Sequence, residues 1–400
     1  MRSPGGHEAA LGGASAGGFP PGDPIATLLA ARTAANHAFF VAESQHIARL
    51  CEQMSQRFSR GGRLLAVGES PAARSDARHV AVEFVHPVIV GKRALPALAF
   101  ERADEVALMA RPEDMVLAFD GKAPQGCFEV AIPAPPSDDP FIRQELTETY
   151  YHLLWELVHV FFEHGGRQSA GGGAASFLYP FLDDKATDVD ALLADVARSV
   201  VMKADEIGAL REQTLTEGAE TLHAAAEELR ARLDAGGTLL ALGNGGSATD
   251  AMDVVADFRA AGRRALDLTE DPAIITALAN DIGTDAIFSR QVIAYGGPGD
   301  ALIALSTSGN SESVITALVE ARKRGLMTIA CVGYGGGRVA AEALADHVIV
   351  TRSTVASGGA SARSRAMKRS TVPAGPSIST STPRESFSTW PARSSSHASR

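Results

Sequence analysis

The chain has 400 residues, of which 45% are hydrophobic and 21% are charged, and its formal net charge at pH 7 is −10. The length favours two domains, and the apolar content is high enough for a large core, which excludes a wholly disordered protein. The excess of negative charge argues against nucleic acid as a partner.

The sequence has no clear pattern for a membrane helix, a secretory signal or a disulfide framework. No apolar run reaches the roughly 20 residues of a membrane helix, and no secretory signal opens the chain. The three cysteines lie far apart, which argues against a disulfide framework and against a cysteine-based zinc site. We therefore expect a cytoplasmic protein without a membrane partner.

In chain order, long helical stretches precede two predicted domains. Composition shifts to Gly, Pro and Ser mark a linker and two ends that we expect to be disordered. The predicted long helices are Asp23–Arg60 and Asp183–Ala235. The predicted segments are 1–23 (disordered), 24–164 (first domain), 165–182 (linker), 183–352 (second domain) and 353–400 (disordered).

The C-terminal segment differs in charge from the rest. Residues 353–400 contain seven Lys/Arg and one Glu and are rich in Ser. Three explanations stay open: a solvated appendage, a basic segment that binds an acidic partner, and a shifted reading frame at the end of the gene.

Three blocks of the first half recur in the same order in the second. Each pair shares apolar positions and turn glycines, which predicts a tandem duplication. The pairs are GGRLLAVGES (61–70) with GGTLLALGNG (236–245), SDARHVAVEF (75–84) with TDAMDVVADF (249–258), and RPEDMVLAFD (111–120) with GPGDALIALS (297–306).

Strands alternate with helices in the second half, which predicts an α/β fold with a parallel sheet covered on both faces. Predicted strands are Thr238–Leu242, Ala301–Leu305, Met327–Val332 and His347–Val350, and predicted helices begin near Ser247 and cover Glu312–Arg324 and Arg338–Ala345.

Two small-residue loops follow neighbouring strands, GNGGSATD (243–250) and STSGNSES (306–313). Each leads into a helix N-terminus, where free N–H groups favour a phosphate. Neither loop has a P-loop or GxGxxG pattern, so we expect no nucleotide cofactor.

These loops, with ALANDIG between them, resemble the sugar isomerase (SIS) domain, and within it the phosphoheptose isomerases. The resemblance covers Ala186–Val350, and Ile25–His164 resembles a degenerate copy. It implies two tandem three-layer sandwiches with parallel sheets flanked by helices. It also implies ketose–aldose isomerisation of a sedoheptulose 7-phosphate-type sugar through an enediol, and oligomers with sites at subunit interfaces.

The resemblance also implies site residues, and they are divided between the halves. The family carries a His and, four residues later, a Glu as metal ligands, the Glu also serving as base. The second half has Asp253 and Asp257 there, while the first half has His79 and Glu83 and, on its closing helix, Gln144 and His152. The implied catalytic residues are Glu83, His152 and Asp257; the implied Zn2+ ligands are His79, Glu83, Gln144 and His152; the implied substrate-binding residues are Asn244, Gly245, Gly246, Asn280, Asp281, Ser306, Thr307, Ser308 and Ser311.

Several interpretations stay open. The halves can pair as an intramolecular pseudo-dimer, or the chain can self-associate, and build a phosphosugar isomerase site from both copies. Alternatively the protein is a non-catalytic regulator or scaffold that binds a sugar phosphate, or an adaptor that acts through its surfaces. His79, Gln144 and His152 could also be ordinary half-buried polar residues on amphipathic helices.

Overall fold

The computed structural model describes residues 23–87, 92–165 and 189–352. Residues 1–22, 166–188 and 353–400 lie outside the described residues. The structure therefore does not test the expected disordered ends, the linker, the start of the second long helix or the three explanations for residues 353–400.

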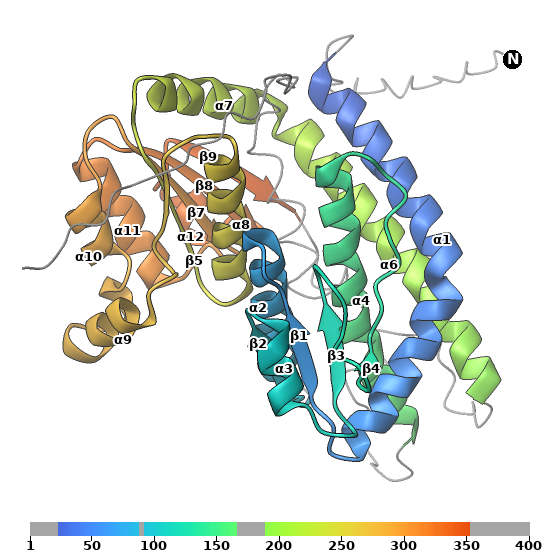
Figure 1. The fold of residues 1–400 in the computed structure, drawn as a ribbon. Coiled ribbons are helices and arrows are strands. Elements are labelled where there is room, and N and C mark those ends of the chain that lie inside the picture. Colours follow the sequence, from blue (N-terminus) through green and yellow to red (C-terminus); the bar gives the residue numbers. More distant parts are fainter. Residues whose placement is uncertain (1–22, 88–91, 166–188, 353–400) are drawn as a thin grey trace, which may run out of the picture.

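The first half forms an all-parallel sheet with the strand order β2-β1-β3-β4 (Figure 1). Strand β1 is buried at every residue, as expected for a central strand covered on both faces. Its strands are β1 (Leu64–Val67), β2 (Ala97–Phe100), β3 (Met115–Ala118) and β4 (Phe128–Glu129); its helices are α1 (Pro24–Ser59), α2 (Pro71–Val85), α3 (Ala103–Met109) and α4 (Pro140–Gly165).

The second half repeats this order with one strand more, β6-β5-β7-β8-β9, again all parallel. Its strands are β5 (Leu239–Gly243), β6 (Ala265–Asp267), β7 (Ala301–Ser306), β8 (Met327–Gly333) and β9 (His347–Thr351). Its helices are α6 (Val189–Glu217), α7 (Ala219–Asp234), α8 (Gly246–Ala260), α9 (Pro272–Asp281), η1 (Thr284–Ala286), α10 (Ser289–Tyr295), α11 (Glu312–Lys323) and α12 (Gly337–Ala341).

The predicted class, an α/β fold with two parallel sheets flanked by helices, is confirmed. One helix ends earlier than expected: α12 stops at Ala341, and Ala343 has a positive φ of 48° that no helix continues through. The strands β2, β4 and β6 had no counterpart among the predicted elements, because runs of two to four residues carry too little periodicity.

The repeated blocks form the same hydrogen bonds in both halves. Asp114 accepts the backbone N–H groups of Arg63 (2.8 Å) and Arg111 (3.0 Å) ahead of β3. At the equivalent position Asp300 accepts those of Thr238 (2.7 Å) and Gly297 (2.9 Å) ahead of β7. One carboxylate therefore ties the turn before the third strand to the start of the first strand in each half.

The halves pack against each other through their long helices, as predicted. In Figure 1, α1, α4 and α6 lie side by side, and α2 of the first half lies on α8 of the second. Asn36 of α1 donates its side-chain amide to the carbonyl of Ala204 on α6 (2.8 Å). The N-terminal part of α6 enters the hydrophobic core of the first half through Leu192 and Val196. Helix α6 is therefore common to both halves.

By length and composition, α1 is the helix among the described residues that could cross a membrane. In this fold it packs against α4 and α6 and buries the polar side chains of Arg32 and Asn36. Its apolar residues Phe40 and Ile47 are fully buried in the core of the first half. Part of its apolar surface is therefore buried within the folded chain.

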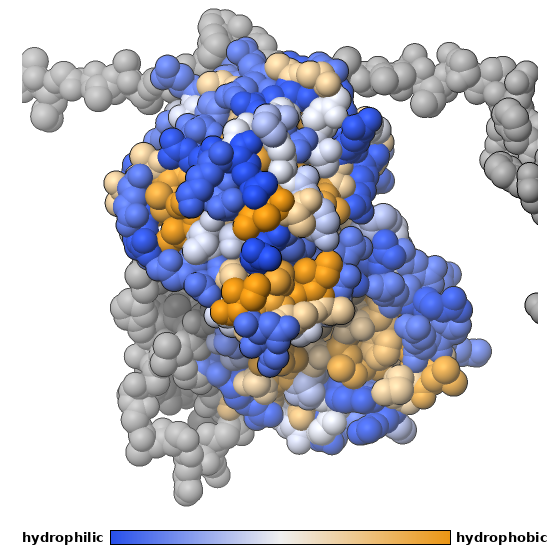
Figure 2. Space-filling view, turned by 90° about the vertical axis from the view of Figure 1, so that its left-hand side faces the viewer, coloured by the Kyte–Doolittle hydropathy of each residue, from blue (hydrophilic) through white to orange (hydrophobic). Residues whose placement is uncertain are grey.

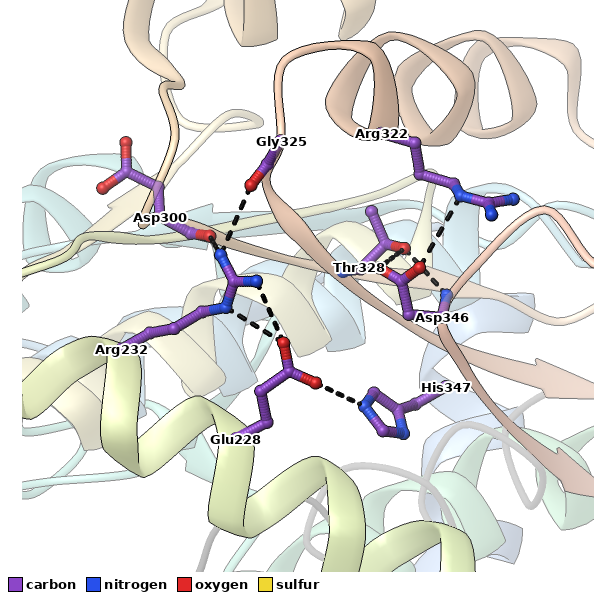
Figure 3. A network of polar contacts seen from close by, with 8 residues as sticks. All are labelled: Glu228, Arg232, Asp300, Arg322, Gly325, Thr328, Asp346 and His347. Carbon is purple, nitrogen blue, oxygen red and sulfur yellow. Dashed lines mark hydrogen bonds and ion pairs between the residues drawn. The ribbon is translucent and has the colours of Figure 1, made fainter.

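A polar network closes the amino edge of the second sheet (Figure 3). Arg232 of α7 donates to the carbonyls of Asp300 (3.2 Å) and Gly325 (3.3 Å), which precede β7 and β8. Glu228 accepts from Arg232 (2.9 Å) and lies 3.1 Å from His347 at the start of β9, and these contacts hold the pKa of Glu228 below its usual range. The opposite, carboxyl edge carries the loops with predicted chemistry.

Candidate functional site

The two small-residue loops meet at the carboxyl edge of the second sheet. Gly243 at the end of β5 pairs with Leu305 on β7, and the Asn244 amide donates to the Ser313 hydroxyl (2.9 Å). The buried Ser306 hydroxyl accepts the N–H of Gly309 (3.2 Å). Glycine is required at that position, because φ is 63° and a Cβ would lie 2.1 Å from the carbonyl oxygen of Gly336.

Helix α11 begins in this loop. Its N-cap residue Ser311 makes no side-chain capping hydrogen bond, while Thr307 and Ser308 are half-buried beside it. The Ser308 hydroxyl accepts the N–H of Asn310 (3.1 Å). Small hydroxyl residues at the start of a 12-residue helix are suited to an anion such as a phosphate group.

The predicted Asn-Asp pair also belongs to the second half. Asn280 and Asp281 are exposed at the C-terminal end of α9, and the Asn280 amide donates to Asp281 (2.7 Å). Helix α9 has no buried residue, and apolar patches mark the side of the molecule on which α9 and α10 lie (Figure 2).

Three of the predicted metal and acid/base residues converge in the first half. Glu83 lies between two imidazoles, with Oε2 2.5 Å from His152 Nδ1 and Oε1 3.6 Å from His79 Nε2. One ligand atom from each residue lies within 4.8 Å of the others. His79 and His152 are 1% exposed, and the Glu83 side chain, at 12%, is the member that reaches solvent.

The second half supplies one wall of this cluster. His79 Nδ1 lies 2.8 Å from the hydroxyl of Thr249 on α8 and 3.8 Å from the buried carboxylate of Asp250. A Cβ at Gly246, in the first small-residue loop, would lie 3.2 Å from His79 Nε2. Ser75 of α2 donates to the carbonyl of Thr249 (2.7 Å), which joins the two helices at this point. The imidazole of the first half therefore touches the predicted substrate loop of the second.

Gln144 lies on the same helix as His152 but has other partners. Its amide nitrogen donates to both oxygens of Asp76 (2.8 Å each) and to Glu148 (3.3 Å). Asp76, Glu148 and Asp253 form a buried cluster of carboxylates at the α2, α4 and α8 contact. The Tyr151 hydroxyl also donates to Asp76 (3.2 Å), and burial together with these carboxylates raises the pKa of Tyr151 well above its usual value.

The replacements for the family's His and Glu on α8 do not form a second His-Glu-His site. Asp253 belongs to the carboxylate cluster, and Asp257 is half-buried one turn later, outside the group formed by His79, Glu83 and His152. Of the two carboxylates considered as base, Glu83 contacts the imidazoles of His79 and His152.

A carboxylate takes the place of a phosphate-binding hydroxyl in the first half. Asp120 stands where the repeat has Ser306, and it accepts the backbone N–H groups of Glu69 (2.7 Å) and Ser70 (2.6 Å) at the start of α2. These are the N–H groups that an anion would use at a helix N-terminus. In the first half, the Asp120 carboxylate therefore occupies backbone N–H groups that would otherwise be available to a bound anion.

Sequence reasoning missed Asp76, Thr249 and Asp250. A signal was present, because the repeat places an aspartate at the same position in SDARHVAVEF and TDAMDVVADF. Its neighbours could not be named from the sequence, because the contacts join different helices. Asp76 of α2 accepts from Gln144 of α4, and Asp250 of α8 lies 3.8 Å from His79 of α2.

The donor set of the first-half cluster suits a zinc ion. Two imidazole nitrogens and one carboxylate oxygen form the ligand set of many catalytic zinc sites, which leave a fourth position open. His79, Glu83 and His152 fit this pattern, whereas the Gln144 amide nitrogen is committed to the carboxylate cluster. Their role as ligands stays a prediction.

Comparisons with known proteins agree with the resemblance. The SIS domain family matches residues 204–333. A phosphoheptose isomerase of Nitratidesulfovibrio vulgaris is 40% identical over 164 residues, which cover 39% of this chain and 78% of that protein. One from Bordetella avium is 45% identical over 145 residues, which cover 35% and 73%. The solved phosphoheptose isomerase of Neisseria gonorrhoeae is 34% identical, covers 42% of this chain and 91% of that one, and has a TM-score of 0.39. With this identity over more than two thirds of a relative, the chain belongs to the phosphoheptose isomerase family within the SIS-domain superfamily.

Proposed function

We propose that the protein is a phosphosugar isomerase with one active site per chain, built in cis from both halves. The observation that carries the proposal is the contact of His79, from the acid/base cluster, with Gly246 and Thr249 at the predicted substrate loop. The printed name of the relatives, phosphoheptose isomerase, supports a phosphorylated heptose as the substrate, and sedoheptulose 7-phosphate is the heptose phosphate that we propose.

Each half contributes a different part of the chemistry. The Ser306, Thr307, Ser308 and Ser311 loop would hold the phosphate through hydroxyl and amide hydrogen bonds. Glu83 would remove the proton from the carbon beside the carbonyl and return it to the neighbouring carbon, which interconverts ketose and aldose through an enediol. His152, 2.5 Å from Glu83, would exchange a proton with the carbonyl or ring oxygen.

A zinc ion held by His79, Glu83 and His152 would supply a Lewis acid that polarises the carbonyl oxygen. The small exposure of Glu83 also matters: its side chain is 12% exposed, and the substrate would have to reach the carboxylate through this exposed part.

The test is an isomerase assay on sedoheptulose 7-phosphate, with and without added Zn2+, for the wild type, Glu83→Gln and Asp257→Asn. The amide keeps the shape of Glu83 and loses the base, so turnover should fall by about 10²- to 10⁴-fold. Asp257→Asn should stay close to the wild type, because Asp257 lies outside the cluster. The reverse order would make Asp257 the base and the first half a scaffold.

A non-catalytic sugar-phosphate binder is the second candidate, favoured by the near-complete burial of His79 and His152. Calorimetric binding of the sugar phosphate without turnover by the wild type would select it.

A further inference from the structure

Thr249 joins the substrate loop of the second half to the imidazole of the first. It lies in the first turn of α8 and is 6% exposed. Its hydroxyl oxygen is 2.6 Å from the carbonyl oxygen of Gly246 and 2.8 Å from His79 Nδ1.

The number of protons on a hydroxyl decides the direction of these hydrogen bonds. A carbonyl can only accept, so the single Thr249 proton is donated to Gly246. The hydroxyl oxygen must then accept from His79, which places a proton on Nδ1 and turns Nε2 toward Glu83 Oε1, 3.6 Å away. The carboxylate of Asp250, 3.8 Å from Nδ1, favours a proton on the same nitrogen.

The ring is also held sterically. Gly246 packs closely on the imidazole: a Cβ there would lie 3.2 Å from Nε2, so a larger residue would press on the ring. The equivalent of Thr249 in the first half, Ser75, donates its hydroxyl to the backbone carbonyl of Thr249 (2.7 Å). The equivalent of His79 in the second half is Asp253, so an imidazole stands at this position of the repeat in the first half only.

We propose that Thr249 is a positioning residue that holds His79 with Nδ1 protonated and Nε2 aimed at Glu83 and His152. The half that carries the phosphate loop would then set the ligand geometry of the other half. A histidine that binds a metal commonly donates its second ring N–H to a nearby acceptor, and loss of that acceptor weakens metal binding. The inference rests on the proposed composite site, with Zn2+ as the ion.

The first experiment measures the Zn2+ affinity of the full chain by competition with a chromophoric chelator. Thr249→Val keeps the shape and removes the hydroxyl, and the affinity should fall by about 10- to 100-fold. Thr249→Ser restores the hydroxyl and should restore the affinity. Ser75→Ala is the control: it removes the hydrogen bond that joins the halves at the Thr249 carbonyl and leaves the Thr249 hydroxyl in place, and should bind as the wild type does.

The second experiment needs neither metal nor turnover. Nitrogen-15 spectra of histidine-labelled, metal-free protein, with the His79 signals identified by their loss in His79→Gln, should show the proton on Nδ1 in the wild type and in Thr249→Ser. An unprotonated Nδ1 in the wild type, or wild-type Zn2+ affinity in Thr249→Val, overturns the role of Thr249. A wild type that binds no Zn2+ overturns the metal site together with this inference. Absence of isomerase activity, with both readouts as expected, overturns only the proposed reaction.

Discussion

Glu145 of α4 is a buried carboxylate where the two halves pack together, and a single substitution there should lower the stability of the folded protein. It is 3% exposed and pairs with Arg32 of α1 and Arg211 of α6, which are 3% and 1% exposed. Three helices that pack together therefore share one buried carboxylate. The change Glu145→Gln removes its charge and nearly keeps its size.

The loss can be estimated in two ways. Hydrogen bonds to charged groups contribute about 1.5–3 kcal/mol each, and Glu145 serves two guanidinium groups. Removing one partner of a buried ion pair costs about 3–5 kcal/mol, because the opposite charge stays buried. Both figures point to a loss of about 3–5 kcal/mol, a large fraction of the 5–15 kcal/mol that typically stabilises a domain.

The assay is urea unfolding at pH 7 followed by far-ultraviolet circular dichroism. Glu113→Gln is the control, because its partner Arg60 and Glu113 itself are 52% and 43% exposed at the side chain, and such a pair contributes less than about 1 kcal/mol. The triple variant Arg32→Met, Glu145→Leu, Arg211→Met should recover stability, since apolar residues can replace a buried ionic cluster. A Glu145→Gln protein within about 1 kcal/mol of the wild type would refute the reasoning. If Glu145→Gln yields no folded protein, the triple variant becomes the test, and its failure to fold would also refute the reasoning.

Three further outcomes follow from the structure. Ser306→Ala with Ser308→Ala should weaken sugar-phosphate binding by about 3–6 kcal/mol, from about 1.5–3 kcal/mol per hydrogen bond to a charged group. Unchanged calorimetric affinity would contradict the role of these hydroxyls in phosphate binding. Calorimetry should find one sugar phosphate per chain, because Asp120 already accepts the Glu69 and Ser70 amides in the first half, and two equal sites would contradict this role. Burial opposes ionisation of Asp114, but hydrogen bonds and the charge of Arg63 outweigh it and lower the pKa of Asp114 below 3.8. The stabilisation by the ionised Asp114 is complete above pH 3.8 and is lost as the pH falls through the lowered pKa. Asp114→Asn should therefore lose about 1.5–3 kcal/mol of folding stability at pH 7 and approach the stability of the wild type in acid. A stability difference that does not change with pH would contradict this role of Asp114.

The sequence by itself determined the class of the fold, the presence of the repeat and the positions of the two small-residue loops at the ends of strands. Buried strands such as Leu239–Gly243 and Ala301–Ser306 are continuous apolar runs that end in glycine or serine, so their positions follow from local pattern. The four-residue spacing of His79 and Glu83 places both on one face of α2, because side chains at i and i+4 of a helix are neighbours. These features depend only on residues close together in the chain.

The tertiary structure decided which residues meet. Gln144 and His152 share a helix at a helical spacing, yet the first contacts Asp76 while the second contacts Glu83, because α2 lies beside α4 along both turns. The contact of His79 with Thr249 joins residues 170 positions apart and depends on how α2 packs on α8. No periodicity encodes such a contact, since it is set by the burial of apolar faces between the halves, and it is this packing that brings His79 to Thr249 and Gly246 of the first small-residue loop.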